Sequence, residues 1–144
     1  MLHTEYYKDG TSCECDEMER LYHRSGVLYL ETPCVNGKEH GIQKSYYVSG
    51  ALESETPCVN GKRNGLEKDY YESGALRRVT PYVCDERHGI QWGYYESGAL
   101  RCKWLFVDGT WDGMRKRYHE CGTLVNENLY SNNKRLYGPM ENFL

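Results

Sequence analysis

The chain has 144 residues, which is enough for one ordinary domain and too few for two. Its formal net charge is only −3 and 13% of its residues are aromatic, the opposite of the highly charged, aromatic-poor composition of disordered chains. Apolar residues make up 39%, but 14 tyrosines and 7 cysteines are counted among them, so we expect an ordered chain with a thin, tyrosine-rich core.

Membrane insertion and secretion are both disfavoured. The longest apolar run, residues 104–107, is far shorter than the roughly 20 residues that a membrane helix needs. No apolar leader follows the first methionine, and the odd number of cysteines favours reduced thiols over a closed disulfide framework. We therefore expect a soluble protein of a reducing, cytoplasmic compartment.

A strict 24-residue period runs through the chain. Ser-Gly pairs begin at residues 25, 49, 73 and 97, and Cys121 and Gly122 continue the series. Each glycine is preceded by one or two tyrosines and followed, two residues later, by a leucine. A second segment, Thr-Pro-Cys-Val-Asn-Gly-Lys, begins at residues 32 and 56 and degenerates in later copies. Five copies therefore share one frame, the mark of a repeat protein.

Each period contains two glycine-bearing turns separated by two extended runs, for example residues 66–71 and 75–83. Asn-Gly and Asp-Gly pairs provide the positive φ that tight hairpin turns require. Two such breaks in every period leave no room for a helix of three turns. The sequence predicts an all-β fold: an elongated antiparallel sheet of tandem hairpins, with about ten strands over roughly 48 Å.

The repeats define one domain, residues 1–144. They are clearest over 12–136, with a truncated copy at 5–11 and a degenerate C-terminal cap at 133–144.

Alternation along the strands divides the side chains between two faces. It places Leu66 and Tyr70 on one face and Glu67 and Tyr71 on the other. We expect the Leu66 face to be the core, with a spine formed by the tyrosines at 22, 46, 70, 94 and 118 and the five leucines. A second ladder is expected to be an exposed aromatic strip that binds a partner: Tyr47, Tyr71 and Tyr95.

The pattern Tyr-Tyr-x-Ser-Gly-x-Leu, followed by Thr-Pro-x-Val-Asn-Gly-Lys and a closing glycine, resembles the variant MORN repeat of bacterial antitoxin-like proteins and of large DNA viruses. The resemblance covers about residues 12–136 and is clearest over 42–100. It implies a long antiparallel sheet and a role in protein interaction, membrane-proximal scaffolding, toxin neutralisation or virion structure. It implies neither catalytic chemistry nor a cofactor.

Cysteine and histidine side chains could suggest a zinc site, but their spacing does not fit one. Cys13 and Cys15 are too close in sequence, and Cys34 and Cys58 are repeat equivalents about 9.6 Å apart, beyond the roughly 7 Å Cα separation of a disulfide. We expect no metal and interpret these cysteines as small, partly buried apolar residues.

Nucleophilic catalysis would need a cysteine or serine beside a histidine and an orienting acid. His40 and His88 occupy the same turn position as Asn64 and Asp112, so the repeat explains them as polar turn residues. The glycines follow the repeat and precede no helix, which excludes a phosphate-binding loop. We expect a protein that is not an enzyme.

Charge is unevenly distributed. Residues 1–60 hold 5 basic against 10 acidic side chains, whereas residues 61–144 hold 13 against 11. The basic residues gather on two adjoining extended runs: Arg101, Lys103, Arg115, Lys116 and Arg117. We expect this basic end to bind an acidic protein, an anionic lipid headgroup or the acidic end of another copy. The overall negative charge disfavours nucleic acid.

All three tryptophans, Trp92, Trp104 and Trp111, lie in the later half. Because aromatic side chains and arginine concentrate binding energy, we expect a partner-binding surface there, and the open sheet edges favour self-association or a larger assembly. The leading hypothesis is a protein-interaction or structural scaffold module, such as a virus-particle component. An antitoxin or immunity protein and a binder of anionic lipid headgroups are the alternatives.

Overall fold

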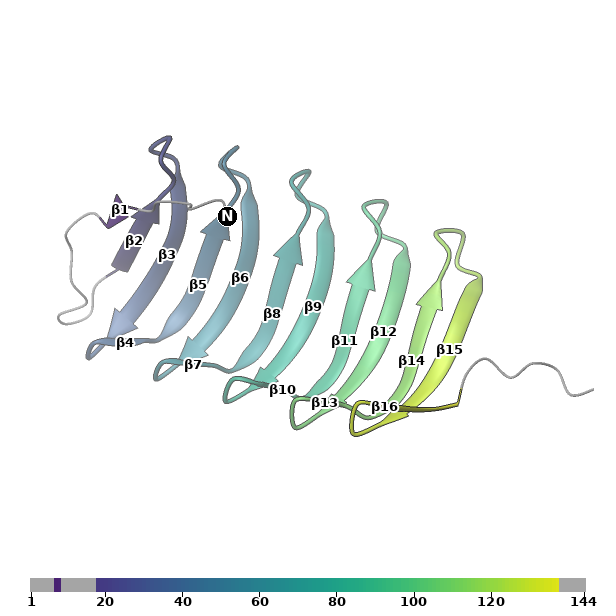
Figure 1. Ribbon diagram of the computed structural model, residues 1–144. Helices are drawn as coiled ribbons and strands as arrows, with labels where there is room; N and C mark the ends of the chain where they lie inside the picture. Colours follow the sequence, from purple (N-terminus) through teal and green to yellow (C-terminus); the bar gives the residue numbers. More distant parts are fainter. Residues whose placement is uncertain (1–6, 9–17, 138–144) are drawn as a thin grey trace, which may run out of the picture.

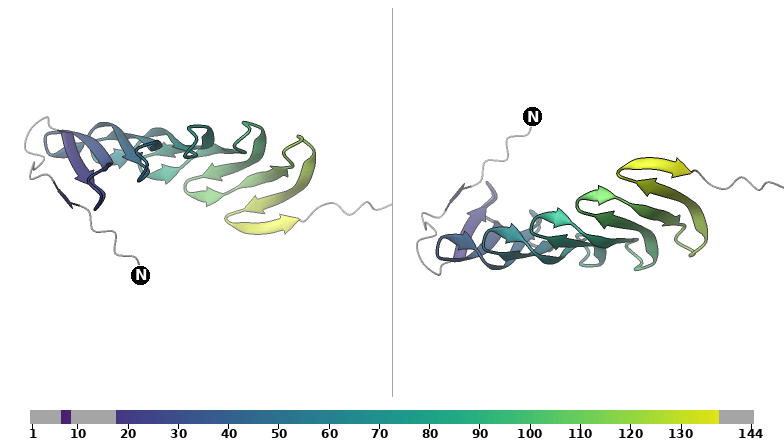
Figure 2. Two further views of the ribbon diagram at one scale, coloured as in Figure 1. Left: turned by 90° about the horizontal axis from the view of Figure 1, so that it is seen from above. Right: turned by 90° about the horizontal axis from the view of Figure 1, so that it is seen from below.

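The computed structural model describes residues 7–8 and 18–137, which form one antiparallel sheet. Figure 1 shows its hairpins side by side in a single row, as the sequence predicted, and Figure 2 shows that this one layer twists along its length. No helix that could span a membrane occurs in the described residues.

The strands follow one another in chain order across the sheet. The long path is β1 (Tyr7–Lys8), β2 (Met18–Tyr22), β3 (Leu28–Val35), β5 (Gly41–Tyr46), β6 (Leu52–Val59), β8 (Gly65–Tyr70), β9 (Leu76–Val83), β11 (Gly89–Tyr94), β12 (Leu100–Val107), β14 (Gly113–Tyr118), β15 (Leu124–Ser131) and β16 (Lys134–Tyr137). Four two-residue strands pair with the end of the strand before them: β4 (Lys38–Glu39), β7 (Lys62–Arg63), β10 (Glu86–Arg87) and β13 (Thr110–Trp111).

The two ends of the chain are described only in part. From the truncated copy at residues 5–11, Tyr7 and Lys8 pair with β2, and from the cap at 133–144, Lys134–Tyr137 pair with β15. Asn133 lies in the turn before β16, and the other residues of these two predicted segments lie outside the described part of the chain, as do Cys13 and Cys15.

Two kinds of turn alternate, both with the positive φ that the sequence predicted. At one end of each hairpin, the amide of Gly50 donates to the Tyr47 carbonyl (2.8 Å), and Gly50 has a φ of 87°. At the other end, Asn36 and Gly37 have φ values of 51° and 71°. Cys84 takes the same left-handed conformation with a φ of 49°, although cysteine rarely adopts it.

The closing glycine of each repeat packs on the strand before it. Gly41 has a φ of 120°, and a Cβ placed there would lie 2.8 Å from Cγ of Pro33. The next repeat brings Gly65 against Pro57 in the same way. The closing glycine of the repeat and the proline of its Thr-Pro segment therefore pack against each other.

The buried face is the one opposite to our expectation. Leu66 and Ile42 are 54% and 51% exposed, whereas Cys58 and Phe106 are 4% and 1% exposed. The buried residues lie on the face of Glu67 and Asp69, which we call the threonine–cysteine face: Thr32, Cys34, Thr56, Cys58, Asp69, Thr80, Gln91, Cys102 and Phe106. The prediction that the Leu66 face is the core was wrong, because side chains of neighbouring hairpins, such as Arg63 over Tyr82 and Glu67 against Thr56, lie across the other face.

The first tyrosine ladder lies half-buried on the opposite face, which we call the isoleucine–lysine face after Ile42 and Lys44. The hydroxyl of Tyr46 donates to Oε1 of Glu31 (2.6 Å), and that of Tyr70 donates to Oε2 of Glu55 (2.9 Å), each across to the preceding hairpin. Burial, together with these carboxylate contacts, raises the pKa of both tyrosines to about 12.

The second ladder holds neighbouring hairpins together. The hydroxyls of Tyr47, Tyr71 and Tyr95 donate to the carbonyl oxygens of Tyr70, Tyr94 and Tyr118 at 2.7, 2.8 and 2.8 Å. In the first repeat, Nε2 of His23 lies 3.1 Å from the Tyr46 carbonyl oxygen. We call this contact the junction clasp. These rings are half-buried, not exposed as the sequence suggested.

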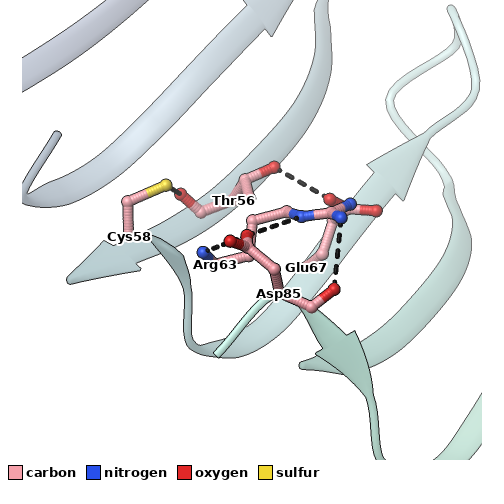
Figure 3. A network of polar contacts seen from close by, with 5 residues as sticks. All are labelled: Thr56, Cys58, Arg63, Glu67 and Asp85. Carbon is pink, nitrogen blue, oxygen red and sulfur yellow. Dashed lines mark hydrogen bonds and ion pairs between the residues drawn. The ribbon is translucent and has the colours of Figure 1, made fainter. Parts of the chain in front are cut away.

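A polar network joins the hairpins at their other end (Figure 3). The Arg63 amide donates to Oδ1 of Asp85 (2.8 Å), the Asp85 amide donates to the Arg63 carbonyl (2.9 Å), and the guanidinium reaches the Asp85 carbonyl (3.3 Å). Thr56 donates to Oε2 of Glu67 across the same junction (3.1 Å). The backbone hydrogen bond from Arg63 lowers the pKa of Asp85, whereas burial raises the pKa of Glu67.

The raised pKa values of Tyr46 and Tyr70 predict alkaline destabilisation. An unfolded tyrosine ionises near pH 10, whereas these two remain protonated in the folded sheet until about pH 12. Their contribution to the free energy of unfolding is therefore complete below pH ~10 and is lost as pH rises to ~12. Urea denaturation across this range should show a smaller decline for the Tyr46→Phe/Tyr70→Phe double variant. Equal declines would contradict the assignment.

The junction clasp predicts a local stabilisation. Tyr71→Phe removes one hydrogen bond and leaves the Tyr94 carbonyl without its side-chain donor, so the free energy of unfolding should fall by about 1 kcal/mol. Urea denaturation measures the change, and Glu72→Ala in the exposed adjacent turn is the control, with an expected change below about 0.5 kcal/mol. If both variants unfold like the wild type, the clasp does not hold the hairpins together.

Candidate binding surface

Aromatic side chains gather on the threonine–cysteine face of the last repeats. The ring centroids of Trp104 and Trp111 are 6.0 Å apart, those of Phe106 and Trp111 are 6.3 Å apart, and those of Trp111 and Tyr130 are 5.6 Å apart. The guanidinium carbon of Arg115 lies 4.4 Å from the centre of the Trp104 ring and 5.5 Å from that of Trp111. We call these five residues the Trp–Arg cluster.

The cluster continues a ladder that begins earlier in the sheet. A residue of two of the short strands covers an aromatic ring of the next repeat: Arg63 of β7 lies over Tyr82 (4.1 Å), and Arg87 of β10 lies over Phe106 (4.4 Å). Trp111 occupies the next position of the short strands and meets Tyr130 edge-on. The repeat therefore supplies the stacking geometry, and the exchange of arginine for tryptophan makes the last step aromatic.

A second set of repeat-equivalent residues, the column that begins with Thr32 and Gln43, also changes its chemistry at the Trp–Arg cluster. In the first junction, Nε2 of Gln43 donates to the Thr32 hydroxyl (2.9 Å), and in the next, the Thr56 hydroxyl donates to Glu67. The equivalent pair in the last junction is Trp104 and Arg115, which stack instead of hydrogen bonding. A cation over an aromatic face is attracted by the ring quadrupole, by roughly 0.5–1 kcal/mol at exposed sites.

This exchange leaves polar atoms without partners. Trp104 Nε1, Arg115 Nε, Asn126 Oδ1 and Asn128 Oδ1 are the only buried side-chain nitrogen and oxygen atoms of the described residues that form no hydrogen bond. All four belong to one region, because Asn128 lies opposite Arg115 in the β14–β15 ladder. A buried polar group without a partner costs about 1–3 kcal/mol, so this region is destabilised in the isolated chain.

The charge of this region is one-sided. Four arginines project from the strands on the same face as the cluster: Arg87, Arg115, Arg117 and Arg135. None of them forms an ion pair with a residue that the structure describes. Arg117 and Arg135 are exposed. The surface therefore presents guanidinium groups without compensating carboxylates.

The structure divides the binding residues predicted from the sequence. Trp104, Trp111, Arg115 and Arg117 share one face, and β12 and β14 do adjoin, with Lys103 opposite Lys116. Trp92 and Lys103 lie on the isoleucine–lysine face, with Nζ of Lys103 5.7 Å from the Trp92 ring centre. Lys116 pairs there with Glu127 (3.0 Å), and Arg101 is the exposed, unpaired residue of a β-bulge. The basic residues form no single patch.

Sequence reasoning missed Phe106, Tyr130, Asn126 and Asn128. The 24-residue frame carried a signal for the first two, since Phe106 and Tyr130 take the repeat position of the buried Cys34 and Cys58. It carried no signal for the two asparagines, whose side chains matter only because no hydrogen-bond donor meets them.

Other reactive groups do not assemble into a site. The described cysteines, Cys34, Cys58, Cys84, Cys102 and Cys121, are all free thiols. Within residues 7–8 and 18–137, no three histidine, cysteine or acidic side chains are arranged to hold a metal ion. His88 Nδ1 lies 3.1 Å from Oδ1 of Asp108, both exposed, where the turns of two hairpins meet.

Comparison with known protein families identifies the repeat. Residues 63–83, which span most of one period, match the family model of the MORN repeat variant. No curated protein matches the chain. A MORN repeat indicates a repeat protein that takes part in binding or scaffolding, and such proteins are generally not enzymes.

Proposed function

From the variant MORN repeat and the geometry of its last copies, we propose that this protein is a non-enzymatic protein-interaction module that binds through the Trp–Arg cluster. The observation that carries the proposal is the set of four buried polar atoms without partners among stacked aromatic rings. Because these atoms are buried, a partner reaches them by displacing the side chains that cover them, and the hydrogen bonds it then supplies would recover a free energy that the isolated chain lacks.

The sheet acts by presenting this surface. Aromatic rings and arginines are the residues in which binding energy concentrates, and here the rings are already held in place by their neighbours. Preorganised side chains lose little conformational entropy on binding. The arginines without ion pairs favour a protein partner that brings carboxylates to this face.

The same arginines support a second candidate, the binding of an anionic lipid headgroup. Arg117 is exposed and pairs with no carboxylate among the described residues, so it is free to meet a phosphate. This alternative requires salt-sensitive binding to anionic vesicles that is lost in the Arg115→Ala/Arg117→Ala variant. A headgroup phosphate could accept hydrogen bonds from Trp104 Nε1 and Arg115 Nε, but it gives none to Oδ1 of Asn126 and Asn128, so the two asparagines favour the protein partner.

The identity of the partner would distinguish an antitoxin from a structural component of a virus particle. A toxin held one to one would make the chain an antitoxin, and a coat protein held in a large assembly would make it a structural component of a virus particle. The free thiols support a reducing, cytoplasmic setting for either role.

Trp104→Ala tests the binding surface, and Trp92→Ala on the opposite face is a matched control. Affinity capture from the native source, followed by mass spectrometry, identifies the partner, and titration then compares the variants. We expect Trp104→Ala to weaken binding by at least about tenfold and Trp92→Ala to leave it unchanged.

Circular dichroism and thermal melting confirm that both variants remain folded. Trp111→Ala is less informative, because Trp111 packs between Phe106 and Tyr130 and its loss would loosen the sheet. Full binding by Trp104→Ala, or loss of binding only in Trp92→Ala, would reject the Trp–Arg cluster as the surface.

A further inference from the structure

We propose that the outer edge of β15 is an open repeat junction that binds β2 of a second copy, so that copies of this chain join head to tail. The inference concerns the edge of the sheet. It shares the unpartnered Asn126 and Asn128 with the proposed function, but it also rests on the pairing positions of β15, His119 and Glu127, which the proposed function does not use.

Four internal junctions show what a junction consists of. In each, strands of neighbouring hairpins pair at only two positions, for example Leu30 with Ser45 and Glu31 with Lys44. In each, the junction clasp carries a tyrosine or histidine side chain to the carbonyl oxygen of the next hairpin. In the first two, a tyrosine hydroxyl of the next hairpin also donates to a glutamate, as Tyr46 does to Glu31.

The C-terminal edge carries the same groups. Asn126 and Glu127 are the fifth members of the pairing positions, and β16 pairs with β15 only from Leu129 onward. His119 is the fifth member of the clasp; its side chain is exposed and forms no hydrogen bond with a described residue. His23 shows that a histidine can make this contact.

A polar group at this edge also lacks its partner. Asn128 takes the repeat position of Thr32, whose hydroxyl accepts a hydrogen bond from Gln43 of the next hairpin. The buried Oδ1 atoms of Asn126 and Asn128 have no donor. Among the described residues, His119, Asn126 and Asn128 therefore lack the partners that the internal junctions supply, and Glu127, which pairs with Lys116 of its own hairpin, lacks the tyrosine hydroxyl that reaches Glu31 and Glu55.

The internal junctions also define the strand that fits. Lys44 and Tyr46 meet Glu31, and Lys68 and Tyr70 meet Glu55, so the incoming strand needs a basic residue and, two residues later, a tyrosine. Strand β2 has Arg20 and Tyr22 at these repeat positions. In a head-to-tail contact, both side chains would meet Glu127 of the other copy.

Strand β2 is also the available one. The strands β5, β8 and β14 share this spacing but lie inside the sheet, and β16, with Arg135 and Tyr137, is already paired with β15 of its own chain. The outer side of β2 meets only Tyr7 and Lys8 of β1, which must move aside. Figure 1 shows β2 and β15 at opposite ends of the row. The first 60 residues carry a net charge of −5 and the remainder +2, which favours head-to-tail contact. Such an interface does not close on itself, so it extends into a chain of copies.

Sedimentation velocity of the full chain over a range of concentrations tests the proposal. We expect the mass to rise with concentration in steps of one monomer. His119→Ala, Arg20→Glu and Glu127→Arg should each weaken association by about tenfold, and the Arg20→Glu/Glu127→Arg double variant should recover most of it by exchanging the charges. Glu72→Arg, in an exposed turn, is the matched charge control and should associate like the wild type.

Circular dichroism and melting show which variants remain folded. Because His119 is exposed, His119→Ala tests the edge even if a change at Arg20 or Glu127 disturbs its own hairpin. A monomer at every concentration would overturn the proposal. So would an unchanged association of Arg20→Glu together with loss in Glu127→Arg, because that result would mean that the β15 edge binds something other than β2.

Discussion

The backbone offers few contacts between one hairpin and the next: two paired strand positions, and a hydrogen bond between turns such as that from the Asp85 amide to the Arg63 carbonyl. The rest of the structure therefore depends on the side chains that cross this gap. Three sets of hydrogen bonds join neighbouring hairpins: the junction clasp, the carboxylate contacts of Tyr46 and Tyr70, and the network around Arg63 and Asp85. A sheet of one layer has no second layer to bury it, so stability must come from contacts between neighbours.

The binding surface arises from the same ladders that hold the sheet together. Where the column of Thr32 and Thr56 reaches Trp104, stacking on Arg115 replaces the hydrogen bonds, and polar atoms remain without partners. A repeat protein can thus acquire a site without a new element or a deep pocket. A few exchanges at equivalent positions in its last copies change the chemistry of a face and preserve its geometry.

Face and edge offer two separate modes of association. The Trp–Arg cluster presents rings and guanidinium groups across the strands, whereas the edge of β15 presents backbone groups, His119 and Glu127 along a strand. The edge contact would use Asn126 and Asn128, whereas Trp104, Trp111 and Arg115 would remain on the face, so a chain of copies joined through their edges would display one Trp–Arg cluster per copy. This arrangement would combine the binding and scaffolding roles that a MORN repeat indicates.

The sequence by itself determined the hairpins, the turns and the 24-residue spacing, because positive φ at Asn-Gly pairs and glycines and the alternation of side chains are local properties. It also located the aromatic and basic residues in the later repeats. Only the tertiary structure decided that the face of Glu67 is buried, and that Trp92 and Lys103 lie apart from Trp104 and Arg115. Alternation divides residues between two faces, but the face that is covered depends on which side chains of the neighbouring hairpins lie across it.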